Sequence, residues 1–190
     1  MVKRSDQRLI IFDLDETLVH TTEKRLEGRI EDARYKDCYI YKRPSLDDFL
    51  IECSLSYRVA IWSSAEDDYV RGVVSAIISA DLQLEFVWGR SDCWIKVVRV
   101  KDESGISFKQ NVYIKPLEKI RRKGYRTEQL LIIDDTPQKV IDNKGKYLII
   151  NPFEGNPDDR ELHRLAAYLR DSVDEENFSN MANDHWRNHY

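Results

Sequence analysis

The sequence predicts an α/β fold in which a central parallel β-sheet is flanked by helices. Short, continuous apolar runs recur along the 190 residues, and segments with a helical pattern separate them. Strands that alternate with helices are typical of right-handed βαβ units, which build parallel sheets. A hydrophobic fraction of 42% is sufficient for the core that such a sheet needs.

Five apolar runs are the expected strands of this sheet. Each is short, continuous and rich in β-branched residues, the pattern of a buried strand. In chain order they cover residues 9–15, 57–63, 84–89, 129–135 and 146–151.

Four segments predict the covering helices. The first follows Pro44, with Ser45 as its N-cap, and the third has proline at its first position and glycine just past its end. The expected ranges are 45–55, 65–80, 116–124 and 157–173.

Two further segments interrupt the strand and helix alternation. Residues 21–43 form a polar flap whose end, "DCYIYKR", predicts one strand of a β-hairpin. Residues 93–114 predict a small antiparallel insertion, two strands around a Glu-Ser-Gly turn. We therefore expect a single domain over 1–175. The tail, 176–190, contains Trp186 and two histidines, His185 and His189, and we expect a loosely packed terminus rather than a metal or docking site.

The composition favours a soluble protein of the cytoplasm, without excluding the nucleus. A net charge of −4 argues against general affinity for nucleic acid or anionic membranes. The three cysteines are odd in number and lack CxxC spacing, which predicts neither disulfides nor a zinc site. No apolar stretch has the length of a signal peptide or a membrane span.

Carboxylates directly follow two of the predicted strands. Asp13 and Asp15 end the first strand, and Asp134 and Asp135 end the fourth. Ligands of an open parallel sheet bind outside the carboxyl ends of the strands, so both pairs are expected on one rim. They would repel one another unless a cation lay between them, and oxygen ligands suit Mg²⁺. The alternative is that these acids are helix caps or solvent-facing strand ends.

Several motifs together resemble one enzyme family. "DLDETLVH" matches the pattern DxDx[TV], "KRP" follows the flap, and "IWSS", "GRSDC", "YIKPL", "LIIDDTP" and "DDRELHRL" come later. The chain is similar to the haloacid-dehalogenase-like (HAD) phosphohydrolases. Within them it resembles the FCP/SCP phosphatases, also called NLI-interacting-factor-like, which act on the C-terminal domain of RNA polymerase II. The resemblance covers about residues 9–169 and implies a Rossmann-like HAD fold without a large cap domain.

The resemblance also implies catalytic roles. Asp13 would be the nucleophile that forms an aspartyl-phosphate, and Asp15 the general acid and then the general base. Thr17 would hold the Asp15 loop, Ser63 would donate a hydrogen bond to the transferring phosphoryl group, and Lys115 would neutralise its charge.

The implied cofactor is Mg²⁺. Its ligands would be Asp13, the backbone carbonyl of Asp15 and the carboxylate of Asp135, with Asp134 binding directly or through water. Three weaker candidates could line the phosphate or substrate groove: Ser64, as the alternative donor to Ser63, and Arg43 and Arg90, either of which could instead form a surface ion pair.

The predicted function is therefore a magnesium-dependent phosphomonoester hydrolase. Both insertions are too small to form a full cap, and an open rim favours a phosphate on a macromolecule, so we expect a protein Ser/Thr phosphatase. One alternative is a phosphatase for a polynucleotide end or a small metabolite, for which the basic strip 120–126 would contact phosphate. Another is a non-catalytic HAD domain that binds a phosphorylated partner, although binding alone does not need Asp15.

Overall fold

The structure, a computed structural model, describes residues 8–101, 104–172, 178 and 186. Its centre is a five-stranded sheet in the order β10-β9-β1-β5-β6, with every neighbouring pair parallel. The strands are β1 (Leu9–Phe12), β5 (Arg58–Trp62), β6 (Leu84–Trp88), β9 (Leu130–Asp134) and β10 (Tyr147–Ile149). The predicted α/β class and its parallel sheet are confirmed.

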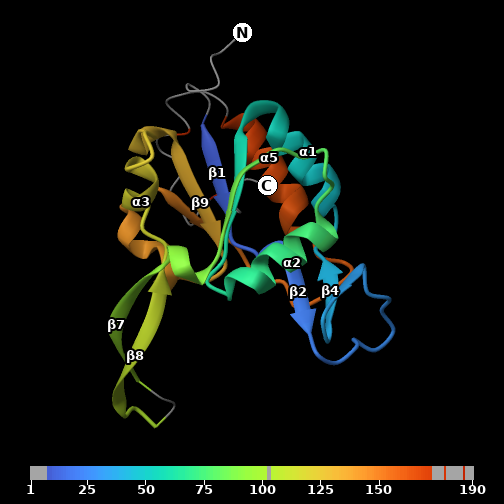
Figure 1. The fold of residues 1–190 in the computed structure, drawn as a ribbon, viewed down its shortest axis with the longest axis horizontal. Coiled ribbons are helices and arrows are strands. Elements are labelled where there is room, and N and C mark those ends of the chain that lie inside the picture. The colour runs from blue at the N-terminus through green and yellow to red at the C-terminus, as the bar shows by residue number, and fades with distance from the viewer. Residues whose placement is uncertain (1–7, 102–103, 173–177, 179–185, 187–190) are drawn as a thin grey trace.

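Helices cover both faces of the sheet because alternate residues of each strand point to opposite sides. Ile10 and Phe12 of β1 face a core built with three helices, α1 (Leu46–Ser56), α2 (Asp67–Ile77) and α5 (Glu161–Asp171). Leu9 and Ile11 face a smaller core, with α3 (Glu118–Arg121) and α4 (Pro137–Val140). Figure 1 shows α1 and α5 on one side of the sheet and α3 on the other.

Ser45 was predicted to be the N-cap of α1, but its side chain does not cap the helix. It lies in the left-handed region with φ of 67° and makes no side-chain cap hydrogen bond. A capping side chain needs an extended backbone to reach the first free N–H groups, so this prediction is wrong for a conformational reason.

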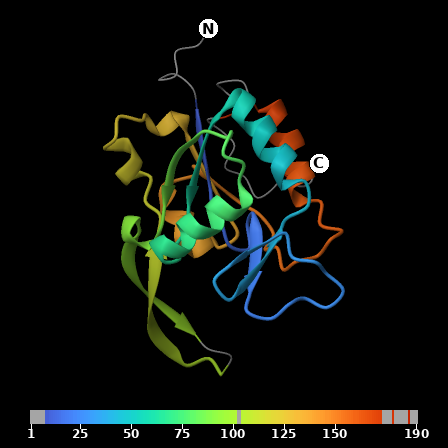
Figure 2. The same ribbon diagram turned by 45° about the vertical axis from the view of Figure 1, so that its right-hand side comes forward.

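The flap has three strands rather than a single hairpin. β2 (Val19–Thr22), β4 (Cys38–Lys42) and β3 (Ala33–Tyr35) form an antiparallel sheet in that order. β3 packs against α2, where the rings of Tyr35 and Tyr69 meet edge to face with centroids 6.3 Å apart. The flap is therefore attached to the body through α2 (Figure 2).

The second insertion is the predicted pair of antiparallel strands, β7 (Trp94–Lys101) and β8 (Ser107–Ile114), which we call the arm. At its base the Lys96 ammonium lies 2.5 Å from the Asp142 carboxylate, and the Arg90 guanidinium lies over the Tyr113 ring. Figure 1 shows the arm and the flap at the carboxyl end of the sheet, on opposite sides. The rim of the sheet lies between them.

Two residues of the tail are described, and both are buried. The Phe178 ring stacks on Tyr57 with centroids 5.8 Å apart, and the Trp186 indole N–H donates to the Ile149 carbonyl at 3.3 Å. The prediction of a loosely packed terminus is wrong for these two residues, because their aromatic rings complete the larger core. His185 and His189 lie outside the described residues.

All three cysteines are free, as predicted. Among the described helices, none combines the length and the apolar character required to cross a bilayer.

Candidate active site

The two acidic strand ends meet at the carboxyl edge of the sheet. β1 and β9 are neighbours with Phe12 opposite Ile133, and the Asp13 N–H donates to the Ile133 carbonyl at 2.8 Å. The strands therefore deliver Asp13 and Asp134 to the same place. Carboxylate oxygens of Asp13, Asp134 and Asp135 lie within 4.8 Å of one another, and we call these three residues the acid triad.

Lys115 neutralises part of this charge. Its ammonium donates to Asp13 Oδ1 and to Asp134 Oδ2, both at 2.6 Å, and all three side chains are buried. Burial alone would raise the pKa of Asp13, but the Lys115 and Lys139 ammonium groups outweigh it and hold that pKa below its ordinary value. Burial and the nearby Asp13 charge raise the pKa of Asp134 to about 7.

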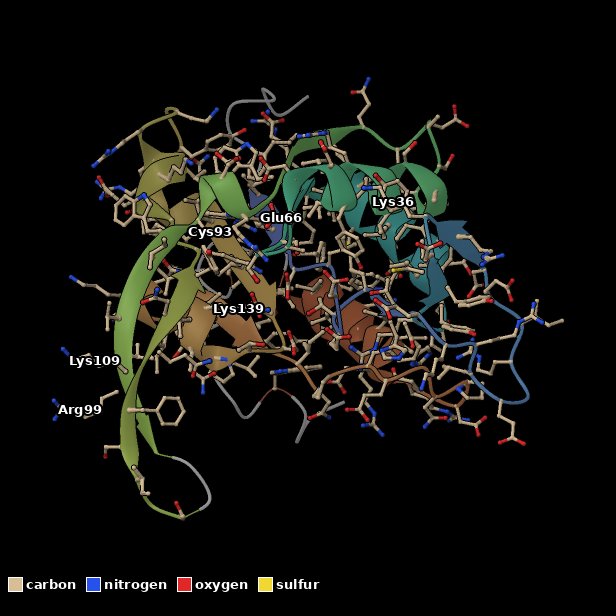
Figure 3. The ribbon with its side chains drawn as sticks, turned by 60° about the horizontal axis from the view of Figure 1, so that its bottom comes forward. Lys36, Glu66, Cys93, Arg99, Lys109 and Lys139 are labelled. Atoms are coloured by element: carbon tan, nitrogen blue, oxygen red, sulfur yellow. The ribbon has the colours of Figure 1, made fainter. Side chains whose placement is uncertain are left out.

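Lys139 brings a second ammonium to the acid triad. It was not among the predicted site residues. Its Nζ lies 3.2 Å from Asp13 Oδ2, 3.8 Å from Asp134 Oδ1 and 3.9 Å from Asp135 Oδ1. Figure 3 looks onto this end of the molecule and shows Lys139 beside the end of β9. Its position four residues after Asp135, in the first turn of α4, is the one local signal that could have indicated the contact.

The acid triad fits a divalent cation. Within the part of the chain that the structure describes, Asp135 Oδ1 is buried and accepts no hydrogen bond. Both oxygens of Asp134 are in use, by Lys115 and by the Thr136 N–H at 2.9 Å. The Lys139 ammonium already lies where a cation would bind, and hard oxygen donors are what Mg²⁺ prefers. Asp135 therefore offers the freest ligand atom.

Asp15 lies beside the acid triad in a different environment. Its Oδ1 accepts from the Tyr69 hydroxyl at 2.5 Å and from the Thr21 hydroxyl at 3.4 Å, and its Oδ2 accepts from Ser63 at 3.3 Å. Burial raises the pKa of Asp15, and the Tyr69 hydrogen bond offsets only part of that effect. Tyr69 and Thr21 were not among the predicted site residues.

Of the two neighbouring serines, Ser63 is the one that reaches Asp15. Its hydroxyl is buried and also accepts from the Ala65 N–H at 3.0 Å. Ser64 instead offers its carbonyl to Arg90 Nε at 2.9 Å. Arg90 also pairs with Glu66, which places its partly exposed guanidinium on the rim between α2 and the arm.

Comparison with known proteins now identifies the family. The model of the NLI interacting factor-like phosphatase family matches residues 8–179. The chain belongs to this family.

Two curated relatives match most of this chain and are longer than it. A probable C-terminal domain small phosphatase of Dictyostelium discoideum is 27% identical over 178 residues, which cover 87% of this chain and 51% of the relative. The human carboxy-terminal domain RNA polymerase II polypeptide A small phosphatase 1 is 26% identical over 171 residues, 87% of this chain and 59% of its own length. The chain thus spans between half and two thirds of these relatives.

Solved structures share the fold. The structure of Fcp1, an essential RNA polymerase II CTD phosphatase, superposes with a TM-score of 0.68 at 18% identity, over 90% of this chain and 63% of that one. A fission yeast Fcp1 bound to beryllium fluoride gives 0.66, also at 18% identity, over 90% and 64%.

Arg43 was predicted to line a phosphate or substrate groove, but in this member of the family it does not. Its side chain is completely buried and donates to both carboxylate oxygens of Asp159 at 2.8 Å, to the Thr17 carbonyl at 3.1 Å and to the Asn151 carbonyl at 2.9 Å. The prediction is wrong because the guanidinium is used up by these acceptors. Arg43 instead holds the loop after β1 against two later loops.

Thr17 lies in that loop. Its N–H donates to the Leu14 carbonyl at 3.3 Å, and its carbonyl accepts from Arg43. Its hydroxyl is buried and, among the described residues, has no hydrogen-bond partner. The residue therefore contributes to the loop through its backbone.

Proposed function

We propose that this chain is a magnesium-dependent phosphomonoester hydrolase that works through an aspartyl-phosphate on Asp13. The observation that carries this proposal is the contrast between Asp13 and Asp15. Two residues apart, they experience opposite effects, because Asp13 has its pKa lowered by ammonium groups and Asp15 has its pKa raised by burial. A pair of carboxyl groups separated in this way supplies one nucleophile and one acid.

The proposed reaction has two steps. A carboxylate oxygen of Asp13 attacks phosphorus, the bond to the leaving oxygen breaks, and Asp15 gives that oxygen its proton. Asp15, now a carboxylate, takes a proton from a water molecule as its oxygen attacks the aspartyl-phosphate. Phosphate leaves and Asp13 is restored.

Other side chains stabilise the charge that develops on the phosphoryl oxygens. Lys115 is already in contact with the nucleophile at 2.6 Å, and Ser63 lies beside Asp15. Asp13, Asp135, the Asp15 carbonyl and, directly or through water, Asp134 would hold Mg²⁺, which would supply Lewis-acid neutralisation of the same charge.

We further propose phosphoserine or phosphothreonine polypeptides as the substrates. The flap and the arm flank the rim from opposite sides (Figures 1 and 2), and both are too small to form a full cap, which favours a phosphate on a macromolecule. Two relatives are named as small phosphatases of a C-terminal domain, which supports this class of substrate.

The basic strip 120–126 does not favour a polynucleotide. Arg121 and Arg122 pair with Glu118 at 2.7 and 3.7 Å, and Arg126 directly precedes the segment that leads into β9. Arg126 therefore lies near the start of β9, whereas the acid triad lies at its end.

Two variants and a control test the chemistry. Asp13→Asn should abolish hydrolysis of p-nitrophenyl phosphate in Mg²⁺. Asp15→Asn should slow turnover of a phosphopeptide by about 10²–10⁴-fold, the usual contribution of a general acid, while it still binds beryllium trifluoride. Asp68→Asn, at an exposed site in α2, should leave both rates unchanged. Activity near wild type in Asp13→Asn would remove the proposed nucleophile.

The substrate class is tested by one panel. Purified protein is assayed against phosphopeptides, nucleotide 3′- and 5′-phosphates and sugar phosphates at equal concentration. We expect the highest kcat/KM for phosphopeptides. A preference for a nucleotide or sugar phosphate would contradict the proposed substrate while leaving the chemistry in place.

A further inference from the structure

The contacts of Lys139 coincide with the proposed metal site. Its ammonium lies within 4 Å of one oxygen from each member of the acid triad, and those three residues are the ones that fit Mg²⁺. Two cations cannot share these oxygens, because Mg²⁺ binds carboxylate oxygen at about 2.1 Å and an ammonium so close to it would be repelled.

We propose that Lys139 is a built-in competitor of the divalent cation: its ammonium occupies the acid triad when no metal is bound, leaves when metal enters, and so sets the metal affinity. This inference rests on the metal site of the proposed function and goes beyond it, because it assigns a role to a residue outside the expected ligand set.

Charge explains why an ammonium belongs there without metal. The three buried or half-buried carboxylates of the acid triad bring up to three negative charges, and Lys115 compensates only one. Lys139 lowers the remaining imbalance, since an uncompensated buried charge is strongly unfavourable. With a dication present, its ammonium would be in excess.

Geometry explains why Lys139, and not Lys115, is the one that leaves. Lys115 makes two contacts at 2.6 Å and its side chain is fully buried. The Lys139 side chain keeps 20% of its surface exposed, and its contacts are longer, 3.2–3.9 Å. Its contact with Asp135 Oδ1, at 3.9 Å, is too long for a hydrogen bond. The ammonium thus neutralises charge in the acid triad but leaves Asp135 Oδ1 without a hydrogen-bond partner among the described residues. A metal ion would bind that oxygen directly.

Lys139 can withdraw its ammonium without losing the backbone contact that holds α4. The Lys139 carbonyl accepts from the Lys115 N–H at 2.8 Å, so α4 stays attached to the segment after β8 whichever side chain residue 139 has. A substitution at this position therefore removes the ammonium without removing that support.

The test is Mg²⁺ binding to the full chain by titration calorimetry. If the open state without the ammonium has a population of about 10% or less in wild type, Lys139→Met should tighten the Kd about tenfold or more. Lys119→Met is the matched control, because it removes the same charge from a lysine that is 27% exposed, pairs with Asp92 at 2.6 Å and lies over the Trp88 ring. Its Kd should equal that of wild type.

Thermal unfolding gives a second readout. In EDTA, Lys139→Met should melt below wild type, and saturating Mg²⁺ should restore it by more than it stabilises wild type. Lys139→Arg keeps the charge and should retain the weaker wild-type Kd, so the comparison remains decisive where the methionine variant folds only with metal.

The outcomes separate this inference from the function. An equal or weaker affinity in Lys139→Met overturns the competition while phosphatase activity of wild type still supports the hydrolase. No Mg²⁺ binding by either protein overturns the competition together with the metal site.

Discussion

At the scale of single residues, neighbours from distant parts of the chain decide what each carboxyl group can do. Asp13 and Asp15 are close in sequence, but Lys115 reaches the first and Tyr69 reaches the second. The Tyr69 hydroxyl is a short hydrogen-bond donor to a buried acid, and this contact lowers the pKa of Asp15 against the larger effect of burial. Tyr69 is therefore a positioning residue for the proposed acid.

Tyr69→Phe should move the pH profile of catalysis. Removing a hydrogen bond that lowers the pKa of Asp15 raises that pKa further, so Asp15 keeps its proton to higher pH. The alkaline limb of kcat/KM, measured with phenyl phosphate because its leaving group needs a proton, should shift upward.

Tyr35→Phe is the control for this variant. Its hydroxyl donates to the Asp68 carbonyl at the surface, and its ring packs against Tyr69 without touching Asp15. The profile of this control should stay with wild type. A Tyr69→Phe profile with an unmoved alkaline limb, or one moved downward, would refute the positioning role.

At the scale of elements, the flap depends on a close approach that only glycine permits. A Cβ at Gly72 in α2 would lie 1.9 Å from Cε2 of the Tyr35 ring in β3. The ring of Tyr35 is half-buried in this contact and also meets Tyr69. The flap is thereby placed next to the residue that binds Asp15.

The effect of Gly72→Ala on the free energy of unfolding should change sign when the Tyr35 ring is removed. In wild type the added methyl displaces the Tyr35 ring, and the usual gain of about 0.5–1 kcal/mol for alanine in a helix should give way to a net loss of about 1 kcal/mol. In the Tyr35→Ala background the gain should reappear. Urea unfolding of the four proteins of this cycle measures both values. Stabilisation by Gly72→Ala in wild type would show that the ring moves aside at no cost.

A local pattern could predict the strands that lie in a run of apolar or β-branched residues. All five sheet strands and the two strands of the arm lie within their predicted ranges or overlap them, because four or more apolar or β-branched residues mark them. β3, with the sequence Ala-Arg-Tyr, lies in no run of apolar residues, and it forms by pairing with β4. Its sequence carries no periodic signal, so the flap was predicted as one hairpin.

At the scale of the whole molecule, the candidate site could be predicted only as far as motifs extend. Asp13, Asp134 and Lys115 were expected at one site; the parallel register of β1 and β9 brings the two carboxylates together, and Lys115 pairs with both. Lys139 contacts Asp13 across 126 positions, and its spacing of four residues from Asp135 was the one local sign of its place in the acid triad. Arg43 was misplaced because the burial of an arginine depends on acceptors from distant loops.

The Arg43–Asp159 pair connects three parts of the chain, and its loss should lower the free energy of unfolding of the whole domain. Asp159→Asn leaves a fully buried guanidinium without its counter-charge, and breaking such a pair costs about 3 kcal/mol. Asp47→Asn, which breaks the surface pair of Asp47 with Lys42, should cost less than about 1 kcal/mol. Urea unfolding at neutral pH compares the two.

The loss of unfolding free energy in Asp159→Asn should also become smaller as the pH falls. Burial alone would raise the pKa of Asp159, but the hydrogen bonds from Arg43 and from the Glu161 N–H outweigh it and hold that pKa below its ordinary value. A carboxyl group with a lowered folded-state pKa contributes stability that is complete above its unfolded value of about 3.9 and is lost as pH falls through the folded value. The gap in unfolding free energy between wild type and Asp159→Asn should therefore be constant from pH 5 to 7 and shrink below about pH 4. A gap that persists unchanged in acid would mean that the connection between the flap, the loop after β1 and α5 depends on the second oxygen of residue 159, which asparagine replaces with an amide N–H donor, and not on its charge.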